Sequence, residues 1–189
     1  MINSIKLVLE SSANLNNLSK SDFELLNKYK DIFSQWTDEL VKIFYDSIFK
    51  FDKTASIPYK GEREKLEKTL TDWYLDIISG KLNEKFWTKQ WYVGLAHIHR
   101  KVDNKYMVAM MGKFQEEFMK KTFENFDKDL ALKISLAFNR ITNAILAVIV
   151  EGYINMYIKA LEGMTGINKE VLDRIVAIES KKLFIEYKS

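Results

Sequence analysis

The 189-residue sequence contains no cysteine, one proline, seven glycines and two histidines. Without cysteine the chain can form no disulfide, thiolate zinc site, cysteine nucleophile or covalent c-type haem attachment. The scarcity of proline and glycine leaves few breaks of the kind that a sheet-rich fold needs, while Leu, Lys, Glu, Ile and Ala are abundant. The composition therefore predicts an all-α protein, and the lack of cysteine is compatible with a reducing cytoplasm.

Neither a strong charge of one sign nor a long apolar run is present. The net charge is +3 with acidic and basic residues interspersed, so no basic stripe indicates a nucleic-acid or anionic-membrane partner. The most apolar run, residues 144–150, is far shorter than the ~20 residues of a membrane span. P-loop, GxGxxG, nucleophile-elbow and HExxH motifs are also missing. We expect a soluble, cytoplasmic protein with one well-filled core.

Apolar residues recur at intervals of three and four along most of the chain, which is the helical period. Ser21 followed by Glu24 predicts a capping box at the start of the first long helix. The loop at 52–61, around Pro58, shows no helix of its own, and the longest predicted helix has apolar residues on nearly every side between 144 and 150. The predicted helices span residues 3–10, 21–35, 37–51, 62–79, 83–102, 105–122, 130–161 and 168 onward, with Asn168 as the expected N-cap of the last.

Both histidines lie in one aromatic-rich helical stretch, residues 91–111. His97 and His99 are two positions apart, which turns them roughly 200° from each other on a helix, so they cannot bind one metal ion together. His99 precedes Arg100 and is expected to be solvated, whereas His97 is expected to face the core. Two interpretations of His97 remain open: a core histidine that bonds a backbone carbonyl, or a metal ligand.

The residues around His97 resemble the proximal helix of the sensor-type globins, the group that contains globin-coupled sensors and protoglobins. Gly94 lies three residues before the histidine, and Arg100, Val102 and Tyr106 follow it at the family's spacing. The resemblance implies a globin fold with an extra N-terminal helix and no short distal D helix. It also implies that His97 is the iron ligand of haem b.

A second part of the resemblance lies on the opposite side of the expected haem. The pair Phe44 and Tyr45, with Ile48 after it, is similar to the family's distal motif, and Leu66 and Thr69 occupy the positions of its distal-helix residues. Tyr45, assisted by Thr69, would then donate a hydrogen bond to a diatomic ligand. The alternatives are that the Tyr45 hydroxyl bonds a backbone carbonyl and that Thr69 bonds the carbonyl four residues before it.

The resemblance has further implications for the cofactor contacts and for function. We expect residues 1–163 to form a haem-binding sensor domain and 164–189 a helical linker or tail, of the kind that could lead to an output domain. The expected function is sensing of O₂, or of CO or NO, by a homodimer formed through the last two globin helices, without enzymatic activity of its own. A single-domain globin that binds or scavenges O₂ or NO, and a haem-free scaffold, are the alternatives. The residues expected to contact haem are Phe44, Phe49, Leu66, Trp73, Val93, Val102, Tyr106 and Met110.

Overall fold

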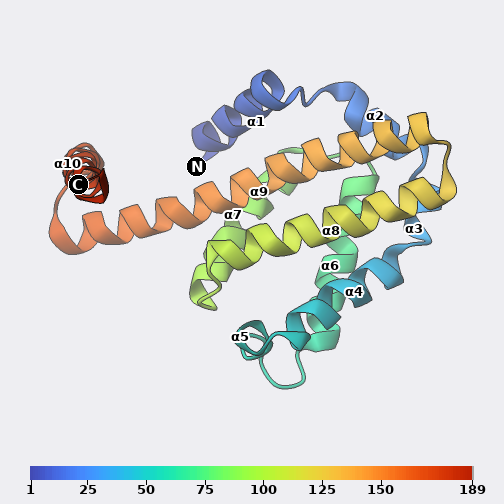
Figure 1. Cartoon of the computed structure of the whole chain (residues 1–189), viewed down its shortest axis with the longest axis horizontal. Helices are drawn as coiled ribbons and strands as arrows, with labels where there is room; N and C mark the ends of the chain where they lie inside the picture. Colours follow the sequence, from blue (N-terminus) through green and yellow to red (C-terminus); the bar gives the residue numbers. More distant parts are fainter. Residues whose placement is uncertain (189) are drawn as a thin grey trace. The chain divides into compact units, whose positions relative to one another are not determined.

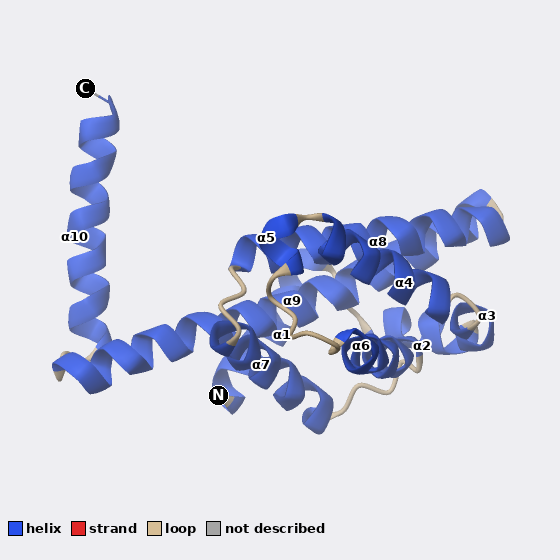
Figure 2. Ribbon diagram, turned by 90° about the horizontal axis from the view of Figure 1, so that it is seen from below, coloured by secondary structure: helices blue, strands red, loops and turns tan. Residues whose placement is uncertain are grey.

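The computed structural model describes residues 1–188, and these form helices joined by loops with no strand among them (Figures 1 and 2). The all-α prediction is confirmed. The described part of the chain consists of two compact units, residues 1–152 and 153–188, and the boundary between them falls inside the longest helix. The helices are α1 (Ile2–Asn16), α2 (Lys20–Lys28), α3 (Lys30–Ser34), α4 (Thr37–Lys50), α5 (Asp52–Ala55), α6 (Arg63–Ile78), α7 (Glu84–His99), α8 (Asn104–Asn125), α9 (Lys128–Thr165) and α10 (Lys169–Lys188).

In the first unit, α8 and the first part of α9 lie side by side (Figure 1). They are joined by a hydrogen bond of 2.7 Å between the hydroxyls of Thr122 and Ser135, and by Gln115, whose side-chain amide donates to the hydroxyl of Thr142 at 2.8 Å. Helix α4 packs against α6, α5 and α8. The core is therefore enclosed by helices that come from both halves of the unit.

The centre of this core is aromatic. The rings of Phe118 and Phe138 are stacked with their centroids 3.8 Å apart, and Phe33 meets Phe118 edge-on at 5.3 Å. Tyr74 is fully buried and donates its hydroxyl hydrogen to the Phe33 carbonyl at 3.0 Å. Burial raises the pKa of Tyr74, so its phenol stays protonated and the hydrogen bond is retained.

The first long helix starts earlier than its sequence pattern predicts and is interrupted. The capping box is formed by Ser19 and Asp22, with the Ser19 backbone N–H donating to the Asp22 carboxylate at 2.8 Å. Asp22 is buried and also receives a bond of 3.1 Å from Arg140 of α9, whereas Glu24 is exposed and pairs with Lys20. The predicted capping box of Ser21 and Glu24 is therefore wrong, because a distant arginine stabilises the alternative start.

One helical turn, α5, occupies part of the segment for which the sequence pattern predicts only a loop. The Thr54 hydroxyl donates to the carbonyls of Ile48 at 2.7 Å and Phe51 at 3.0 Å, which closes the turn after α4. A four-residue turn contains too few positions to show a helical period, so the pattern could not reveal it.

The boundaries of α7 follow from its flanking residues. The Asn83 side chain caps the helix by accepting a hydrogen bond of 3.0 Å from the Phe86 backbone N–H, so α7 begins next to its predicted start at residue 83. The helix ends at His99, and Lys101 then adopts a left-handed φ of 57° that turns the chain toward α8.

The second unit contains the end of α9, a turn and α10. Gly166 has a φ of 70° at the turn, and the Asn168 side chain caps α10 by accepting from the Val171 backbone N–H at 3.0 Å, as predicted. None of the described residues of α10 is buried, and Ile175, Ile178 and Leu183 are exposed. The functional boundary after Gly163 stays a prediction.

Within residues 1–188, α9 is the one helix whose length and composition would allow it to cross a membrane, with a mean hydropathy of 1.5 over its most apolar window. The core helix of a soluble protein has the same properties. Several apolar side chains of α9 lie in the core and are fully buried, namely Ile134, Phe138, Ile141, Ile145 and Val148.

Candidate functional site

Helices α6 and α7 are bridged by side chains at two places. The Trp73 indole N–H donates to the Gln90 side-chain oxygen at 3.0 Å, and Arg100 donates to both Glu62 carboxylate oxygens at 2.7 and 2.5 Å. The later residue of α6 meets the earlier residue of α7, so the two helices are antiparallel. In this antiparallel pair, the residues that follow Glu62 on α6 lie opposite those that precede Arg100 on α7, so Leu66 is expected opposite the turn that contains His97. We call the side chains between these two bridges, together with Tyr45, the candidate site.

His97 is placed in the candidate site, and His99 is exposed, as predicted. The Nδ1 atom of His97 lies 2.7 Å from the Val93 carbonyl oxygen, so the tautomer that bonds it carries its proton on Nδ1. The Nε2 atom then has a free lone pair, and no described residue bonds it. Burial lowers the pKa of His97 despite the Val93 bond, which favours the neutral imidazole. A neutral histidine with Nδ1–H on a carbonyl is the usual state of a metal-binding histidine, although a core histidine can adopt it too.

Tyr45 is buried on α4 and reaches across to α6. Its hydroxyl donates to the Leu66 carbonyl at 2.9 Å, so the backbone-carbonyl alternative describes this conformation. Burial raises the pKa of Tyr45, and the nearby Glu67 and Glu62 raise it further. Tyr45 therefore stays a neutral hydrogen-bond donor, held at the Leu66 carbonyl of α6.

Thr69 is exposed in the structure. Its hydroxyl donates to the Lys65 carbonyl at 2.9 Å, which is the local alternative to a role in the pocket. Neither hydroxyl proposed for the distal side is therefore free in this conformation, and each must leave a carbonyl before it can contact a ligand.

Aromatic rings form one side of the candidate site. Phe44 lies 5.3 Å from Tyr45 and 5.9 Å from Phe114, and Trp73 lies 5.8 Å from Phe114, all measured between ring centroids. Phe114 thus joins α4 and α6, although it is not among the haem contacts predicted from the sequence. Its position one turn after Met110 on the same face of α8 is the signal that could have assigned it to the site.

Gln90 is a second residue that the sequence analysis does not assign. It is fully buried and also donates to the Phe86 carbonyl at 3.2 Å. It precedes His97 by seven positions on the same face of α7, so a polar residue on an otherwise apolar stripe was the available signal.

The remaining predicted contact residues are less closely grouped. The Arg63 guanidinium lies over the Phe49 ring at 5.2 Å, and Tyr106 meets Phe51 at 6.2 Å. The other three are half-buried: Val93, Val102 and Met110. Phe49 and Tyr106 thus lie beside charged or exposed groups and are at the edge of the site at most.

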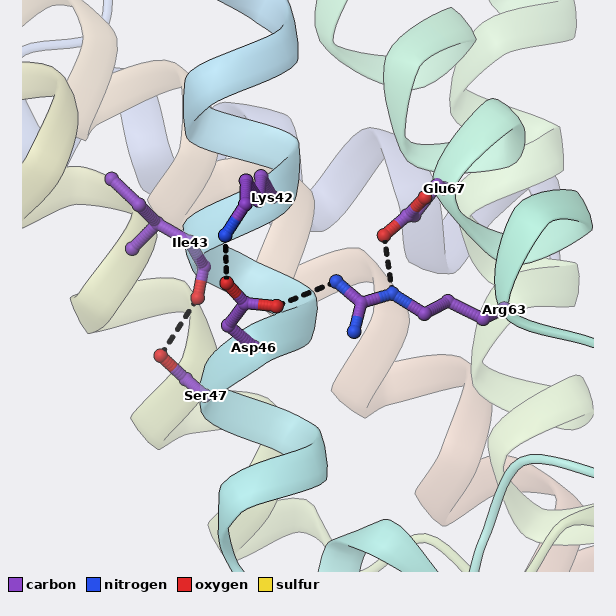
Figure 3. A network of polar contacts seen from close by, with 6 residues as sticks. All are labelled: Lys42, Ile43, Asp46, Ser47, Arg63 and Glu67. Carbon is purple, nitrogen blue, oxygen red and sulfur yellow. Dashed lines mark hydrogen bonds and ion pairs between the residues drawn. The ribbon is translucent and has the colours of Figure 1, made fainter.

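An ion-pair network joins α4 to α6 (Figure 3). Two of its residues, Asp46 and Glu67, directly follow Tyr45 and Leu66 in the sequence. Asp46 accepts from Lys42 at 2.5 Å and from Arg63 at 2.6 Å, and Arg63 also donates to Glu67 at 2.7 Å. The hydrogen bonds from Lys42 and Arg63 lower the pKa of Asp46. Each exposed pair stabilises little alone, but together they hold the register that brings Tyr45 to the Leu66 carbonyl.

No group of three or more His, Asp or Glu side chains in residues 1–188 could hold a metal ion. His97 alone offers one ligand from the candidate site, which leaves the other coordination positions of an iron atom to a cofactor such as a porphyrin.

Comparison with known proteins identifies the family. The Protoglobin family model matches residues 8–159. An uncharacterized protein of Methanocaldococcus jannaschii is 25% identical over 168 residues, which is 87% of each chain. The globin domain of a globin-coupled sensor from Geobacter sulfurreducens has the same fold, with a TM-score of 0.70 and 19% identity over 76% of this chain and 96% of that domain. The globin fold predicted from the sequence is confirmed, and the chain belongs to the protoglobin family.

Proposed function

We propose that this chain binds haem b between α6 and α7, with the Nε2 atom of His97 as the protein ligand to iron. The observation that carries the proposal is the state of His97: neutral, with Nδ1 bonded to the Val93 carbonyl and Nε2 without a partner among the described residues. The aromatic side, formed by the half-buried Phe44 and Trp73 and the buried Phe114, suits a flat apolar macrocycle. When bound, haem supplies an iron that takes up a diatomic gas reversibly.

Tyr45 is the proposed donor to the gas ligand. A dipolar ligand such as O₂ can compete with the Leu66 carbonyl for its hydroxyl hydrogen, whereas CO competes weakly because it is a poor acceptor. The neutral phenol makes Tyr45 a donor at every physiological pH. O₂, rather than CO, is therefore the ligand that the chain itself helps to retain.

The proposed role is an O₂ sensor domain of the cytoplasm, and the alternative is a single-domain globin that binds or scavenges O₂ or NO. Sensing requires a second state that the ligand can favour. The bond between Tyr45 and Leu66 offers such a difference, because its loss on ligand binding changes how α4 is held on α6. The solvent-exposed helix α10, with its apolar side chains, is the part that a simple carrier does not require.

Relay between two subunits would use α8 and the adjoining part of α9. Both helices expose large apolar side chains, namely Val108, Met119, Phe123, Leu132 and Leu136. In a homodimer that covers these residues, α8, which follows the His97 helix in the chain, would contact the partner subunit. Sedimentation at micromolar concentration should give a dimer. Leu136→Glu should weaken it, while Leu75→Glu, at a leucine of similar exposure on α6, should not.

The haem proposal is tested by exchanging the two histidines separately. His97→Ala should abolish stable haem binding, as seen in the visible absorption spectrum after gel filtration. His99→Ala is the matched control on the same helix: His99 is exposed and is not the expected iron ligand, so its loss should leave the visible spectrum nearly unchanged. If His97→Ala retains a wild-type spectrum, or if the two variants behave the other way round, the proposed ligand is wrong.

A further inference from the structure

A cavity of about 630 Å³ lies beside the carboxyl end of α7. Two parts of the chain line most of it. One is α5 and the loop after it, with Lys53 and Tyr59; the other is the end of α7 and the turn before α8, with His99, Arg100, Lys101 and Asp103. These segments are far apart in the sequence, so the cavity exists only in the folded chain.

The cavity is rich in positive charge. Lys53 and Lys101 are exposed and form no ion pair among residues 1–188. Asp103 is the one carboxylate of the lining, and it is already paired with Lys105 at 2.5 Å. Because the carboxyl end of a helix disfavours anions, an anion here depends on these lysines. The lining as a whole suits a carboxylate group.

Arg100 connects this cavity to the candidate site. It follows His97 by less than one helical turn, and its bonds to Glu62 close the same end of the α6 and α7 pair. Glu62 also accepts from the Tyr59 backbone N–H at 3.0 Å, and the Arg100 guanidinium lies over the Tyr59 ring at 4.7 Å. The guanidinium is thus held rigidly, and it retains three N–H groups beyond the two that Glu62 accepts.

We infer that this cavity anchors the two propionate carboxylates of haem, with Lys53 and Lys101 as direct contacts and Arg100 as a positioning residue that also borders the cavity. The inference rests on the proposed haem function. A macrocycle ligated by His97 with its polar edge toward Arg100 would place its carboxylates at the cavity and its apolar edge toward Trp73. The charges and the aromatic side chains would then fix the in-plane orientation of the cofactor.

The test compares haem b with haem dimethyl ester, in which both carboxylates are blocked. Each is loaded into the full chain, and its transfer to excess apomyoglobin is followed by absorbance. Lys53→Ala and Lys101→Ala should each speed the loss of haem b by about 3-fold, and the double variant by about 10-fold. These effects should shrink at high salt. Lys89→Ala, an exposed lysine earlier on α7 that does not line the cavity, is the control.

Dimethyl ester should leave wild type faster than haem b does, and the lysine variants should not change its rate. If the double variant loses haem b no faster than Lys89→Ala, the carboxylates lie elsewhere, and the inference is overturned while His97-dependent haem binding stands. If the double lysine variant binds inorganic phosphate more weakly but retains haem b as wild type does, the cavity is a site for free anions, and this result also overturns the inference. If wild type binds neither haem, the proposed function fails and this inference falls with it.

Discussion

Two buried tyrosines make the same kind of hydrogen bond in very different surroundings. Tyr74 donates to the Phe33 carbonyl inside the closed aromatic core, where Phe118 and Phe138 are also fully buried. Tyr45 donates to the carbonyl of the half-buried Leu66, beside the half-buried ring of Phe44 and with charged side chains nearby.

The difference shows how one helical scaffold provides both stability and binding. A phenol surrounded by packed rings has no alternative partner, so its bond serves the fold alone. A phenol beside incompletely buried apolar groups can donate to a ligand in place of the backbone carbonyl. The hydrogen bond to the ligand then offsets the loss of the hydrogen bond to the carbonyl. The buried hydroxyl is thus structural in one place and available in the other.

The largest expected effect is on the closed core. Phe118→Ala removes a ring stacked at 3.8 Å on Phe138 and should lower the free energy of unfolding by about 3 to 5 kcal/mol. Phe44→Ala, at a half-buried ring of the candidate site, should cost less than half as much but should weaken haem retention. Urea unfolding and haem-loss rates measure the two effects. Equal stability losses would mean that the two regions do not differ in packing.

The two tyrosines themselves give the sharpest comparison. Tyr45→Phe should speed O₂ dissociation by about 10-fold, because a charge-assisted bond to the ligand exceeds the neutral bond to Leu66 by roughly 1.4 kcal/mol. The CO off-rate should change much less. Tyr74→Phe should leave both rates unchanged and lower stability instead. An unchanged O₂ off-rate in Tyr45→Phe, measured by stopped flow, would remove this residue from ligand binding.

The bridge between Glu62 and Arg100 predicts a pH effect at the edge of the site. Hydrogen bonds from Arg100, and then from the Tyr59 backbone, lower the pKa of Glu62 to about 2. A carboxylate whose pKa is lowered by folding stabilises the fold above its unfolded pKa of about 4.3 and loses this contribution as pH falls toward 2. The difference in free energy of unfolding between wild type and Glu62→Gln should therefore decrease as the pH is lowered through this range. A pH-independent difference in urea unfolding would show that the bridge does not form.

The smallest effect is expected at Thr69. Its hydroxyl is exposed and bonded to the Lys65 carbonyl, so Thr69→Val should change the O₂ off-rate by less than about 2-fold, well below the effect at Tyr45. Stopped-flow measurement on both variants makes the comparison direct. A larger effect at Thr69 than at Tyr45 would reverse the assignment of the donor.

Sequence reasoning succeeds where a property is local. Asn168 is correctly identified as a helix cap, and the start of α7 is predicted at its cap, Asn83, because a cap needs only its own side chain and a backbone N–H three residues on. The opposite faces of His97 and His99 follow from the helical period alone. The spacing of residues around His97 and Tyr45 was enough to indicate the globin fold and the protoglobin group.

Properties that depend on distant residues could not be predicted in the same way. The first long helix begins at Ser19 rather than Ser21 because Arg140, 118 residues away in the sequence, bonds Asp22. Either capping box is possible for an isolated peptide, and the choice between them is made by a partner that only the folded chain supplies. The burial of Gln90 likewise depends on Trp73 of another helix.

By itself the sequence determined that the chain is helical, where most helices lie, and that one histidine faces inward, because periodicity and capping act within a few residues. Only the tertiary structure decided which carbonyl holds the Tyr45 hydroxyl, that Thr69 is turned to solvent, and that Lys53 and Lys101 border one cavity. The physical reason is that polar side chains choose partners by distance in space, and packing of α4, α6 and α7 sets those distances.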